Sequence, residues 1–284
     1  MVTGSRGFVG RATDRILGHG YGHTVLNFDI LDGNDIRVKE DVEHFVLVQK
    51  PDRILHLAAI ARFDEADLDP LRAHSTNVVG TANIVAAAER HHVPMVYAST
   101  GSVYMPVTME PPITEDFPTA GNSVYAVTKM LGEELVMAGS MPWIILRYAH
   151  LYGPEKRYHG LFGNLINRME RGLSPQLFGG GQSNDFTYID DVARANRLAL
   201  EAEFDAWNHA YNIGTGEEIS ASVALKVAMK AFGSTADIEY LDSRSVDASR
   251  FVYDVSKAAR GLGFTAEFGL AEGLVDFAKK AELL

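Results

Sequence analysis

The sequence contains no cysteine, which excludes disulfide bonds, thiolate nucleophiles and metal sites with cysteine ligands. This composition fits a reducing compartment, and we expect a cytoplasmic protein. No apolar run approaches the ~18 residues that a membrane-spanning helix needs. The N-terminus also lacks a basic region followed by an apolar one, so we expect a soluble, unprocessed chain without membrane association.

Basic residues are scarce as well: 26 lysines and arginines stand against 37 aspartates and glutamates, for a net charge of -11. No basic cluster is long enough to follow a phosphate backbone, which disfavours nucleic acid as a partner. Among the histidines, His19 and His23 flank glycines, and His91 and His92 end a predicted helix. They do not form a ligand set, and we expect no metal.

The 284 residues, 46% of them hydrophobic, suffice for one large domain or two modest ones. The first half alternates short β-rich runs with segments long enough for crossover helices, which predicts an α/β fold with a doubly wound parallel sheet of the Rossmann type. The predicted strands are 24–28, 53–57, 94–98 and 143–147, and the predicted helices are 7–17, 77–90 and 123–137.

After residue 153 the alternation loosens, which predicts a smaller mixed α/β lobe. We assign residues 1–153 to the Rossmann domain and 154–284 mainly to a substrate-binding lobe, with 186–214 returning to the Rossmann domain. A helix begins near Asp190 and Asp191, which we interpret as N-capping residues. Only three residues precede Gly4, so the first strand is shorter than the ~5 residues usual for a strand, and we expect a few residues of it to be missing upstream.

A glycine-rich loop, Gly4-Ser5-Arg6-Gly7-Phe8-Val9-Gly10, joins the first strand to the first helix. Glycines there permit a tight turn and close approach of the backbone to a pyrophosphate. Asp29 follows Gly10 by 19 positions, where its carboxylate can bind both ribose hydroxyls of NAD and would repel the 2′-phosphate of NADP. The alternative is an ordinary strand-to-helix turn with Asp29 in a second turn. We favour an NAD site.

Tyr125 and Lys129 are four residues apart, on one face of a predicted helix. A phenol has a pKa of ~10, so a tyrosine base needs a nearby cation, which Lys129 and a positive nicotinamide ring could supply. Ser99 and Thr100 end a predicted strand, and ligands of such sheets bind beyond the carboxyl ends of the strands. We predict that Tyr125, Lys129 and a strand-end hydroxyl, of Ser99 or Thr100, are catalytic; the alternative is a solvated tyrosine–lysine pair.

Together these motifs resemble those of the NAD-dependent epimerase/dehydratase family, the extended short-chain dehydrogenases/reductases. The resemblance includes the segments 3–10, 56–59, 77–81 and 99–104 and the Y-x-x-x-K pair. It implies NAD as the cofactor, with contacts from Gly4, Gly7, Phe8, Val9, Gly10, Asp29, Asp35, Ile36, Leu57, Ala58, Ala59, Asn77, Ser99, Tyr125 and Lys129. It implies substrate contacts from Thr100, Tyr125, His150, Asn164 and Arg244.

The resemblance also narrows the reaction. Dehydratases and decarboxylases of this family carry an acidic residue just after the reactive serine or threonine, where this chain has Gly101 and Ser102. A 3,5-epimerising branch uses a cysteine, which is absent here. The expected activity is therefore NAD-dependent 4-epimerisation of a nucleotide sugar, of the UDP-glucose/UDP-galactose type, through transient oxidation to a 4-keto sugar.

Two departures from the family pattern keep other activities open. His150 replaces a substrate-side asparagine, and Asn184 replaces a diphosphate-binding arginine, although Arg157 or Arg244 could compensate. One alternative is a dehydrogenase or reductase acting on a sugar or small carbinol without a nucleotide. A non-catalytic NAD-binding regulator is less favoured, because Tyr125 and Lys129 are intact.

The predicted helix 77–90 is apolar on nearly every face, so we expect that the sheet alone cannot cover it. The helix that begins at Tyr125 is also rich in methionine and leucine. In the family that the sequence resembles, two such helices from each subunit often form a four-helix interface. We therefore expect a homodimer.

Overall fold

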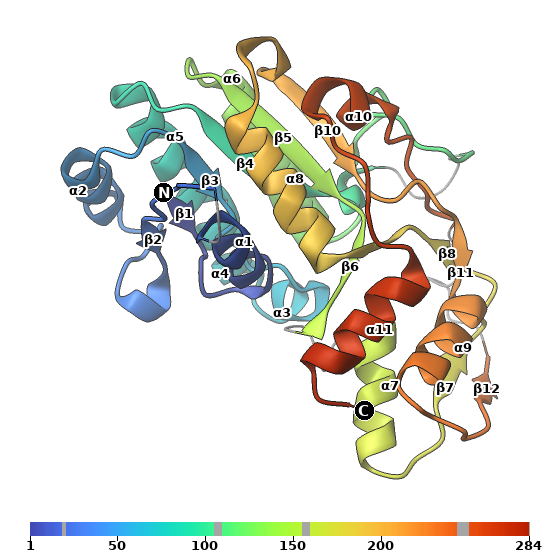
Figure 1. The fold of residues 1–284 in the computed structure, drawn as a ribbon. Coiled ribbons are helices and arrows are strands. Elements are labelled where there is room, and N and C mark those ends of the chain that lie inside the picture. Colours follow the sequence, from blue (N-terminus) through green and yellow to red (C-terminus); the bar gives the residue numbers. More distant parts are fainter. Residues whose placement is uncertain (19–20, 105–109, 155–159, 243–249, 284) are drawn as a thin grey trace.

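The computed structural model describes residues 1–18, 21–104, 110–154, 160–242 and 250–283. Its centre is a six-stranded parallel sheet with the strand order β10–β5–β4–β3–β1–β2 (Figure 1). The strands are β1 (Val2–Thr3), β2 (Asn27–Phe28), β3 (Ile54–His56), β4 (Met95–Thr100), β5 (Trp143–Tyr148) and β10 (His209–Ile213).

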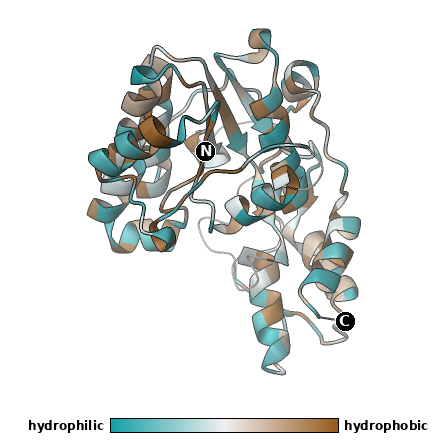
Figure 2. Cartoon of the chain, turned by 60° about the vertical axis from the view of Figure 1, so that its left-hand side comes forward, coloured by the Kyte–Doolittle hydropathy of each residue, from teal (hydrophilic) through white to brown (hydrophobic). Residues whose placement is uncertain are grey.

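Helices cover both faces of this sheet, as the predicted doubly wound fold requires (Figure 1). One face carries α1 (Phe8–Gly18) and α8 (Ile189–Glu201). The other carries α2 (Lys39–Gln49), α5 (Thr81–Arg90) and α6 (Val124–Ala138). Along the outer helices of Figure 2, hydrophobic and hydrophilic residues alternate, as expected of helices with one buried face. The α/β doubly wound prediction is confirmed.

The strand order reverses between β1 and β3, and this switch point brings two chain segments together at the carboxyl ends of the strands. Thr3 Oγ1 accepts hydrogen bonds from the backbone N–H groups of Leu57 and Ala58, both at 3.1 Å. Gly4 has φ +66°, and a Cβ atom there would lie 2.7 Å from the Ala58 nitrogen, so this position needs glycine.

A second lobe extends from one end of the sheet (Figure 1). It contains α7 (Gly160–Glu170), α9 (Ala221–Ala231) and α11 (Leu270–Lys280), with the strand pairs β7 (Gln176–Phe178)–β12 (Glu239–Leu241) and β8 (Ser183–Asn184)–β11 (Ile219–Ser220). Strand β6 (His150–Tyr152) pairs with β9 (Phe186–Tyr188), which precedes α8. Short helices α3 (Phe63–Leu68) and α4 (Pro70–His74) precede a π-helical turn, Ser75–Gly80, and α10 (Ser256–Leu262) lies beside β10.

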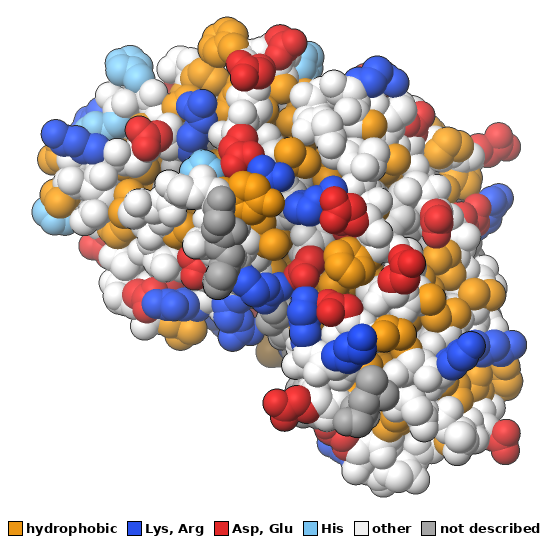
Figure 3. All heavy atoms as spheres, viewed as in Figure 1, with side chains coloured by type: hydrophobic (Ala, Val, Ile, Leu, Met, Phe, Trp, Pro, Cys, Tyr) orange, Lys and Arg blue, Asp and Glu red, His pale blue; other side chains and the backbone are white. Residues whose placement is uncertain are grey.

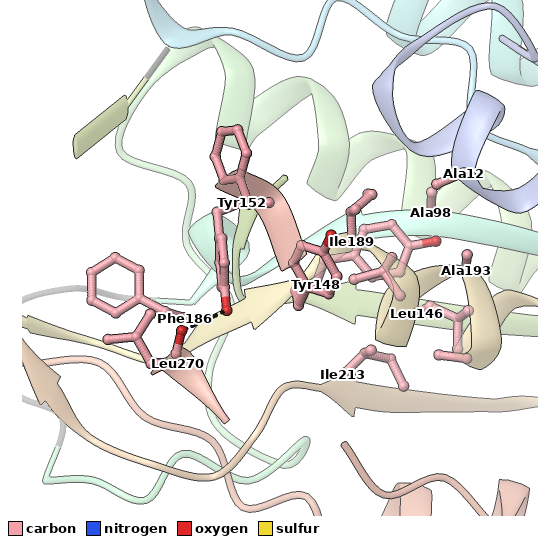
Figure 4. Close-up of a cluster of buried hydrophobic side chains, with 14 of the residues drawn as sticks. Ala12, Ala98, Leu146, Tyr148, Tyr152, Phe186, Ile189, Ala193, Ile213 and Leu270 are labelled. Carbon is pink, nitrogen blue, oxygen red and sulfur yellow. Dashed lines mark hydrogen bonds between the residues drawn. The ribbon is translucent and has the colours of Figure 1, made fainter. Parts of the chain in front are cut away.

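One hydrophobic cluster continues from the sheet into the second lobe (Figure 4). Leu146 and Tyr148 of β5 contribute to it, as do Ile189 of α8 and Tyr152 of β6. The Tyr152 hydroxyl donates a hydrogen bond to the Leu270 carbonyl at 3.4 Å. A separate cluster fills the opposite face of the sheet and includes residues of β2, β3, α2, α5 and α6.

Strand β2 is shorter than the predicted strand 24–28. Since β1 has only two residues, it pairs only with Asn27 and Phe28 of the neighbouring strand. Thr24 is exposed at this edge of the sheet. The other three predicted strands agree with β3, β4 and β5 to within two residues at each end.

The N-cap interpretation of Asp190 and Asp191 is wrong. The buried Asp191 carboxylate accepts hydrogen bonds from the backbone N–H groups of Glu267 and Phe268 and pairs with Arg194. Asp190 forms ion pairs with Arg15 of α1, at 2.5 Å, and with Lys280 of α11, at 2.8 Å. On the face shown in Figure 3, basic and acidic side chains are similarly intermixed.

Most of the predicted helix 77–90 is covered within the single chain, so its burial alone does not require a partner. Helices α2 and α6 pack against α5, so Ile84 is fully buried and Val85 is 7% exposed within the single chain. Val79 of the predicted helix stays 43% exposed, and further exposed apolar side chains lie on the neighbouring elements α3, α4 and the outer side of α6. Across the described parts of the chain, no helix combines the length and the apolar character that crossing a membrane requires.

Candidate active site

The glycine loop lies directly at the switch point of the sheet. A Cβ atom at Gly10 would come within 2.3 Å of the Gly4 carbonyl oxygen, so glycine is required where α1 approaches the loop. The Ser5 hydroxyl is buried and has no hydrogen-bond partner among the described residues. A buried polar atom without a partner is costly. This loop therefore fits a phosphate group that would accept the Ser5 hydrogen bond, and Ser5 is a residue that the sequence interpretation missed.

Asp29 is 7% exposed and lies beside this loop. Its two carboxylate oxygens accept hydrogen bonds from the backbone N–H groups of Arg6 and Leu31, both at 2.9 Å. These bonds fix the carboxylate and leave it further acceptor capacity, because each carboxylate oxygen has more than one lone pair. Asp29 therefore fits a ribose diol and would repel a phosphate.

The remaining expected cofactor residues differ in what their side chains do. Leu57, Ala58 and Ala59 are half-buried beyond the end of β3, as are Phe8 and Val9 at the start of α1, whereas Gly7 is exposed. The carboxylate of Asp35 pairs with Arg37, the nearest atoms being 2.6 Å apart, and the side chain of Ile36 is buried in the core. These two side chains are thus held by the protein itself.

Asn77 is likewise engaged by the protein. Its side chain accepts a hydrogen bond from the Ile60 N–H at 2.8 Å and donates to the Ile60 carbonyl and to Thr128 Oγ1. It therefore fixes the segment after β3 against α6. Ser99 is also buried, and its hydroxyl donates to Glu133 rather than facing the crevice.

Tyr125 and Lys129 lie in the first half of α6, which Ser123 caps by accepting a hydrogen bond from the Ala126 N–H at 3.2 Å. Tyr125 is 9% exposed, and the ring of Phe63 from α3 packs edge-on against it with centroids 5.1 Å apart. Lys129 Nζ lies 4.0 Å from the centre of the Tyr97 ring. The structure thus places both predicted catalytic side chains in one buried layer between α6 and β4.

Thr100 ends β4 and faces the same site. Its Oγ1 accepts a hydrogen bond from the Ser102 N–H and donates one to Ser102 Oγ, both at 3.2 Å. The Thr100 hydroxyl is also close enough to Tyr125 to favour the phenolate. The three predicted catalytic residues are therefore brought together.

Burial opposes the charged forms of this pair. It raises the pKa of Tyr125 to about 12, against the opposite effect of the Thr100 hydroxyl. It lowers the pKa of Lys129 to about 7, against the opposite effect of the Glu133 carboxylate. Without bound ligands, the positive charge of Lys129 does not outweigh the cost of desolvating the Tyr125 phenolate. The phenolate therefore needs further positive charge or hydrogen-bond donors.

Gly101 follows Thr100 and is packed against residues 251–253, where the chain passes back from the second lobe toward the sheet. A Cβ atom there would lie 2.3 Å from Phe251 Cζ and 2.4 Å from the Tyr253 hydroxyl oxygen. A carboxylate at this position would require the Phe251 and Tyr253 rings to shift. The structure therefore adds a steric reason to the absence of the acid that dehydratases carry there.

Two of the expected substrate residues lie on β6 and α7. His150 in β6 packs against the Phe186 ring, with centroids 5.2 Å apart, and Asn164 is exposed on α7. Arg244 and Arg157 lie outside the described residues. Arg250 lines a pocket of about 390 Å³ beside Ser183 and Asn184, and its guanidinium is paired with Glu218 at 2.6 Å. A diphosphate bound by Arg250 would have to displace this carboxylate.

Within the described ranges, no group of three histidine, cysteine, aspartate or glutamate side chains could hold a metal ion. The site consists instead of a nucleotide-binding loop, a tyrosine with a lysine one helical turn away, and a strand-end hydroxyl.

The sequence matches the family described as the NAD dependent epimerase/dehydratase family over residues 1–214. The chain belongs to this family. A putative UDP-glucose 4-epimerase of Methanocaldococcus jannaschii is 29% identical to it over 297 residues, which cover 96% of this chain and 95% of the relative. Membership confirms the family that the sequence motifs resemble.

Solved structures of family members match the whole fold. The UDP-glucose 4-epimerase of Thermotoga maritima, solved with UDP-glucose, has a TM-score of 0.88 at 28% identity, covering 99% of this chain and 98% of that one. The UDP-glucose 4-epimerase of Thermus thermophilus, in complex with NAD, has a TM-score of 0.86 at 28% identity with the same coverage.

Proposed function

We propose that this protein is an NAD-dependent nucleotide-sugar 4-epimerase, an isomerase that interconverts UDP-glucose and UDP-galactose. The observation that carries the proposal is the convergence of Tyr125, Lys129 and Thr100 beside the nucleotide loop, with Phe251 filling the place of a dehydratase acid at Gly101. The relatives named as UDP-glucose 4-epimerases support the choice of substrate.

NAD would be held by the backbone of the glycine loop, by Ser5 and by the Asp29 carboxylate. When bound, NAD supplies the site with a hydride acceptor that later returns the hydride, and its oxidised form adds positive charge. We propose that the Rossmann domain comprises residues 1–153 with 186–214, where β10 and α8 join the main sheet, and that the rest of the chain binds the nucleotide end of the substrate.

In the proposed mechanism, Tyr125 as phenolate accepts the proton of the sugar 4-hydroxyl while Thr100 hydrogen-bonds to the same oxygen. After the keto sugar has presented its opposite face, Tyr125 returns the proton. The position of Tyr125 in the first turn of α6 favours the phenolate, because the helix N-terminus carries partial positive charge. Phe63 covers one edge of the phenol and limits its access to water.

The substrate must be held at its nucleotide end while the sugar ring turns over. We propose that His150, Asn164 and Arg244 contact this substrate. Asn184 supplies no charge, so Arg244 is the candidate for the diphosphate, because a guanidinium matches phosphate geometry. The alternative activity, oxidation of a sugar without a nucleotide, is favoured by Asn184 and by the Arg250–Glu218 pair.

The test is to incubate the purified protein separately with UDP-glucose, UDP-galactose and free galactose, each with NAD. Proton NMR detects the interconversion of the UDP-sugars, and absorbance detects accumulated NADH. We expect interconversion without stoichiometric NADH. Accumulation of NADH from the free sugar, with no change in either UDP-sugar, would assign the protein to the dehydrogenases.

We also propose that the protein acts in the cytoplasm as a homodimer. Leu68 is 87% exposed and Leu71 84%. Nearby, the partly exposed Val127 and Leu131 of α6 line a groove of about 700 Å³ with Pro70 and His74 of α4. Apolar side chains gathered in this way are typical of subunit interfaces. In a symmetric dimer, the same surface of a second copy of the chain would cover these side chains.

A further inference from the structure

Glu133 lies on the same face of α6 as Tyr125 and Lys129, because the three residues are spaced by four. It is 2% exposed. One carboxylate oxygen, Oε1, accepts hydrogen bonds from Ser99 Oγ at 2.5 Å and from Arg147 Nε at 3.0 Å. The other oxygen, Oε2, accepts one from Arg147 Nη2 at 2.7 Å. Both carboxylate oxygens thus accept hydrogen bonds.

The Arg147 guanidinium extends this network away from the site. Its Nη1 donates hydrogen bonds to the Tyr104 hydroxyl at 2.9 Å and to the Glu115 carbonyl at 3.0 Å. The Tyr104 hydroxyl donates in turn to Asn212 Oδ1 at 2.6 Å. The network therefore ties α6 to β4, β5 and β10, and each buried charge has a partner.

The bond between Glu133 and Ser99 has a geometric consequence. Ser99 is the residue before Thr100 in β4, and Glu133 is two helical turns after Tyr125 in α6. Tyr97 of β4 also donates a hydrogen bond to the Lys129 carbonyl of α6, at 3.4 Å. The bond to Ser99 is the one that holds the helix carrying the phenol at the very end of the strand, next to the Thr100 hydroxyl. Proton transfer depends on heavy-atom separations of ~3 Å, so this alignment matters for the reaction.

Glu133 also acts on Lys129 through its charge. Lys129 is 4% exposed and, among the described residues, forms no ion pair. The titratable groups around it are Tyr97 on β4, His56 on β3, and Tyr125 and Glu133 on its own helix. Burial lowers the pKa of Lys129 to about 7, and the Glu133 carboxylate opposes this shift.

We propose that Glu133 is a positioning residue of the epimerase reaction, which fixes Tyr125 relative to Thr100 through Ser99 and keeps Lys129 in its ammonium form. A buried ion pair is seldom more stabilising than a well-packed apolar pair of the same size, so stability alone does not account for this arrangement. The inference rests on the proposed function for the identity of the reaction, but the charge of Lys129 can be measured without it.

Two substitutions separate the two effects. Glu133→Gln keeps the shape and an acceptor oxygen for Ser99 but removes the charge. We expect the titration midpoint of Lys129, followed by NMR of isotope-labelled lysine in the cofactor-free protein and assigned with Lys129→Met, to fall by about one unit or more. The alkaline limb of the kcat profile should move to lower pH, because activity requires the ammonium form.

Ser99→Ala removes the hydrogen bond from the end of β4 to Glu133 of α6, and it leaves the ion pair and the Tyr97–Lys129 hydrogen bond intact. We expect kcat to fall by about tenfold or more, because small displacements of reacting groups are costly, while the pH profile stays in place. Wild-type kcat in this variant would overturn the geometric half of the proposal. An unchanged Lys129 midpoint in Glu133→Gln would overturn the electrostatic half.

Asp191→Asn is the matched control, because Asp191 is also a fully buried carboxylate paired with an arginine but lies in the contact between α8 and the segment 267–268. It should lower stability without moving the Lys129 midpoint, and an equal shift there would contradict the proposal. If Glu133→Gln does not fold, Ser99→Ala, which keeps both charges of the ion pair, still tests the geometric half of the proposal. A wild type without epimerase activity would refute the proposed function, whereas the Lys129 midpoint would still decide the role of Glu133.

Discussion

Phe251 fills the space beside Gly101, with its Cζ atom 2.3 Å from the point where a Cβ of residue 101 would lie. Phe251 belongs to the segment that is bonded to β8 through its N–H and the Ser183 carbonyl, at 3.1 Å. The second lobe therefore reaches the residue after Thr100 and helps to decide which chemistry the site can perform.

Gly101→Asp would introduce the acid that dehydratases carry, but we expect it to destabilise the fold instead of changing the reaction. Overpacking a core typically costs about 1–3 kcal/mol, and an unpaired buried carboxylate adds to this. Denaturant unfolding measures the loss. Ser102→Asp is the control, because Ser102 is half-buried rather than enclosed. A Gly101→Asp variant as stable as the wild type would show that Phe251 can move aside.

Tyr125→Phe should lower kcat by about 10²- to 10⁴-fold, because it removes the proton acceptor but little volume. NAD binding should persist, as measured by cofactor retained after purification. Tyr240→Phe, at a 60% exposed position, should leave both unchanged. A Tyr125→Phe rate within tenfold of the wild type would assign the proton transfer to another group.

Asp29→Asn should weaken NAD by about tenfold and reduce the discrimination against NADP. It keeps an acceptor oxygen for only one of the Arg6 and Leu31 N–H groups, and it removes the charge that a ribose diol binds and a 2′-phosphate avoids. Calorimetric titration of the cofactor-free protein with both dinucleotides is the measurement. Asp32→Asn is the control, because Asp32 lies nearby in an exposed ion pair with Arg6. It should change the affinity for either dinucleotide little. A wild type that prefers NADP would refute the argument.

His56 should make the protein more sensitive to acid. Its ring is enclosed between the hydroxyls of Thr3 and Thr81, and burial, with the Lys129 charge nearby, lowers the pKa of His56 from 6.5 to about 3. Between these values the unfolded chain binds the proton and the folded chain does not. Stability from this source is therefore complete above pH 6.5 and is lost as the pH falls toward 3.

The check is the slope of unfolding free energy against pH over this range. His56→Gln should show a shallower slope than the wild type, while His209→Gln, at an exposed position, should keep the wild-type slope. Parallel slopes for all three proteins would mean that His56 is already protonated in the folded state.

Leu71→Asp should shift the protein from dimer to monomer in sedimentation velocity at micromolar concentration. A charge in a closed apolar interface loses its hydration, whereas the same charge on a monomer surface does not. Leu173→Asp, 47% exposed in the second lobe, should remain dimeric. A monomeric wild type would contradict the proposed homodimer.

The parts of the molecule that could be predicted are those specified by local pattern. Strands β4 and β5 begin with apolar runs, 95–98 and 143–146, that are almost entirely buried, and α6 has a serine cap directly before it. Tyr125, Lys129 and Thr100 could be grouped because parallel strands present their carboxyl ends at one edge of the sheet. Asp29 could be identified from its distance to the glycine loop.

The rest depends on contacts between segments distant in the sequence. Asp191 was expected to cap its own helix but holds residues 267 and 268, and no local pattern specifies that choice. The burial of α5 by α2 and α6 could not be seen in an apolar helix alone. The position of Glu133 could be read from the sequence, because it is the carboxylate one turn beyond Lys129 on the same helix face. Its partner Arg147, however, comes from strand β5, which no local pattern connects to it.

The hydrophobic cluster that joins the sheet to the second lobe has a consequence for how the chain can be divided. Val192, Ala193 and Ala199 of α8 are fully buried in the same cluster as Leu17 of α1 and Phe277 of α11. A fragment ending at residue 153 would expose the face of the sheet that α8 covers. We therefore expect the two lobes to unfold in one cooperative transition, and any exchange of substrate lobes between relatives would have to leave α8 and β10 with the N-terminal half.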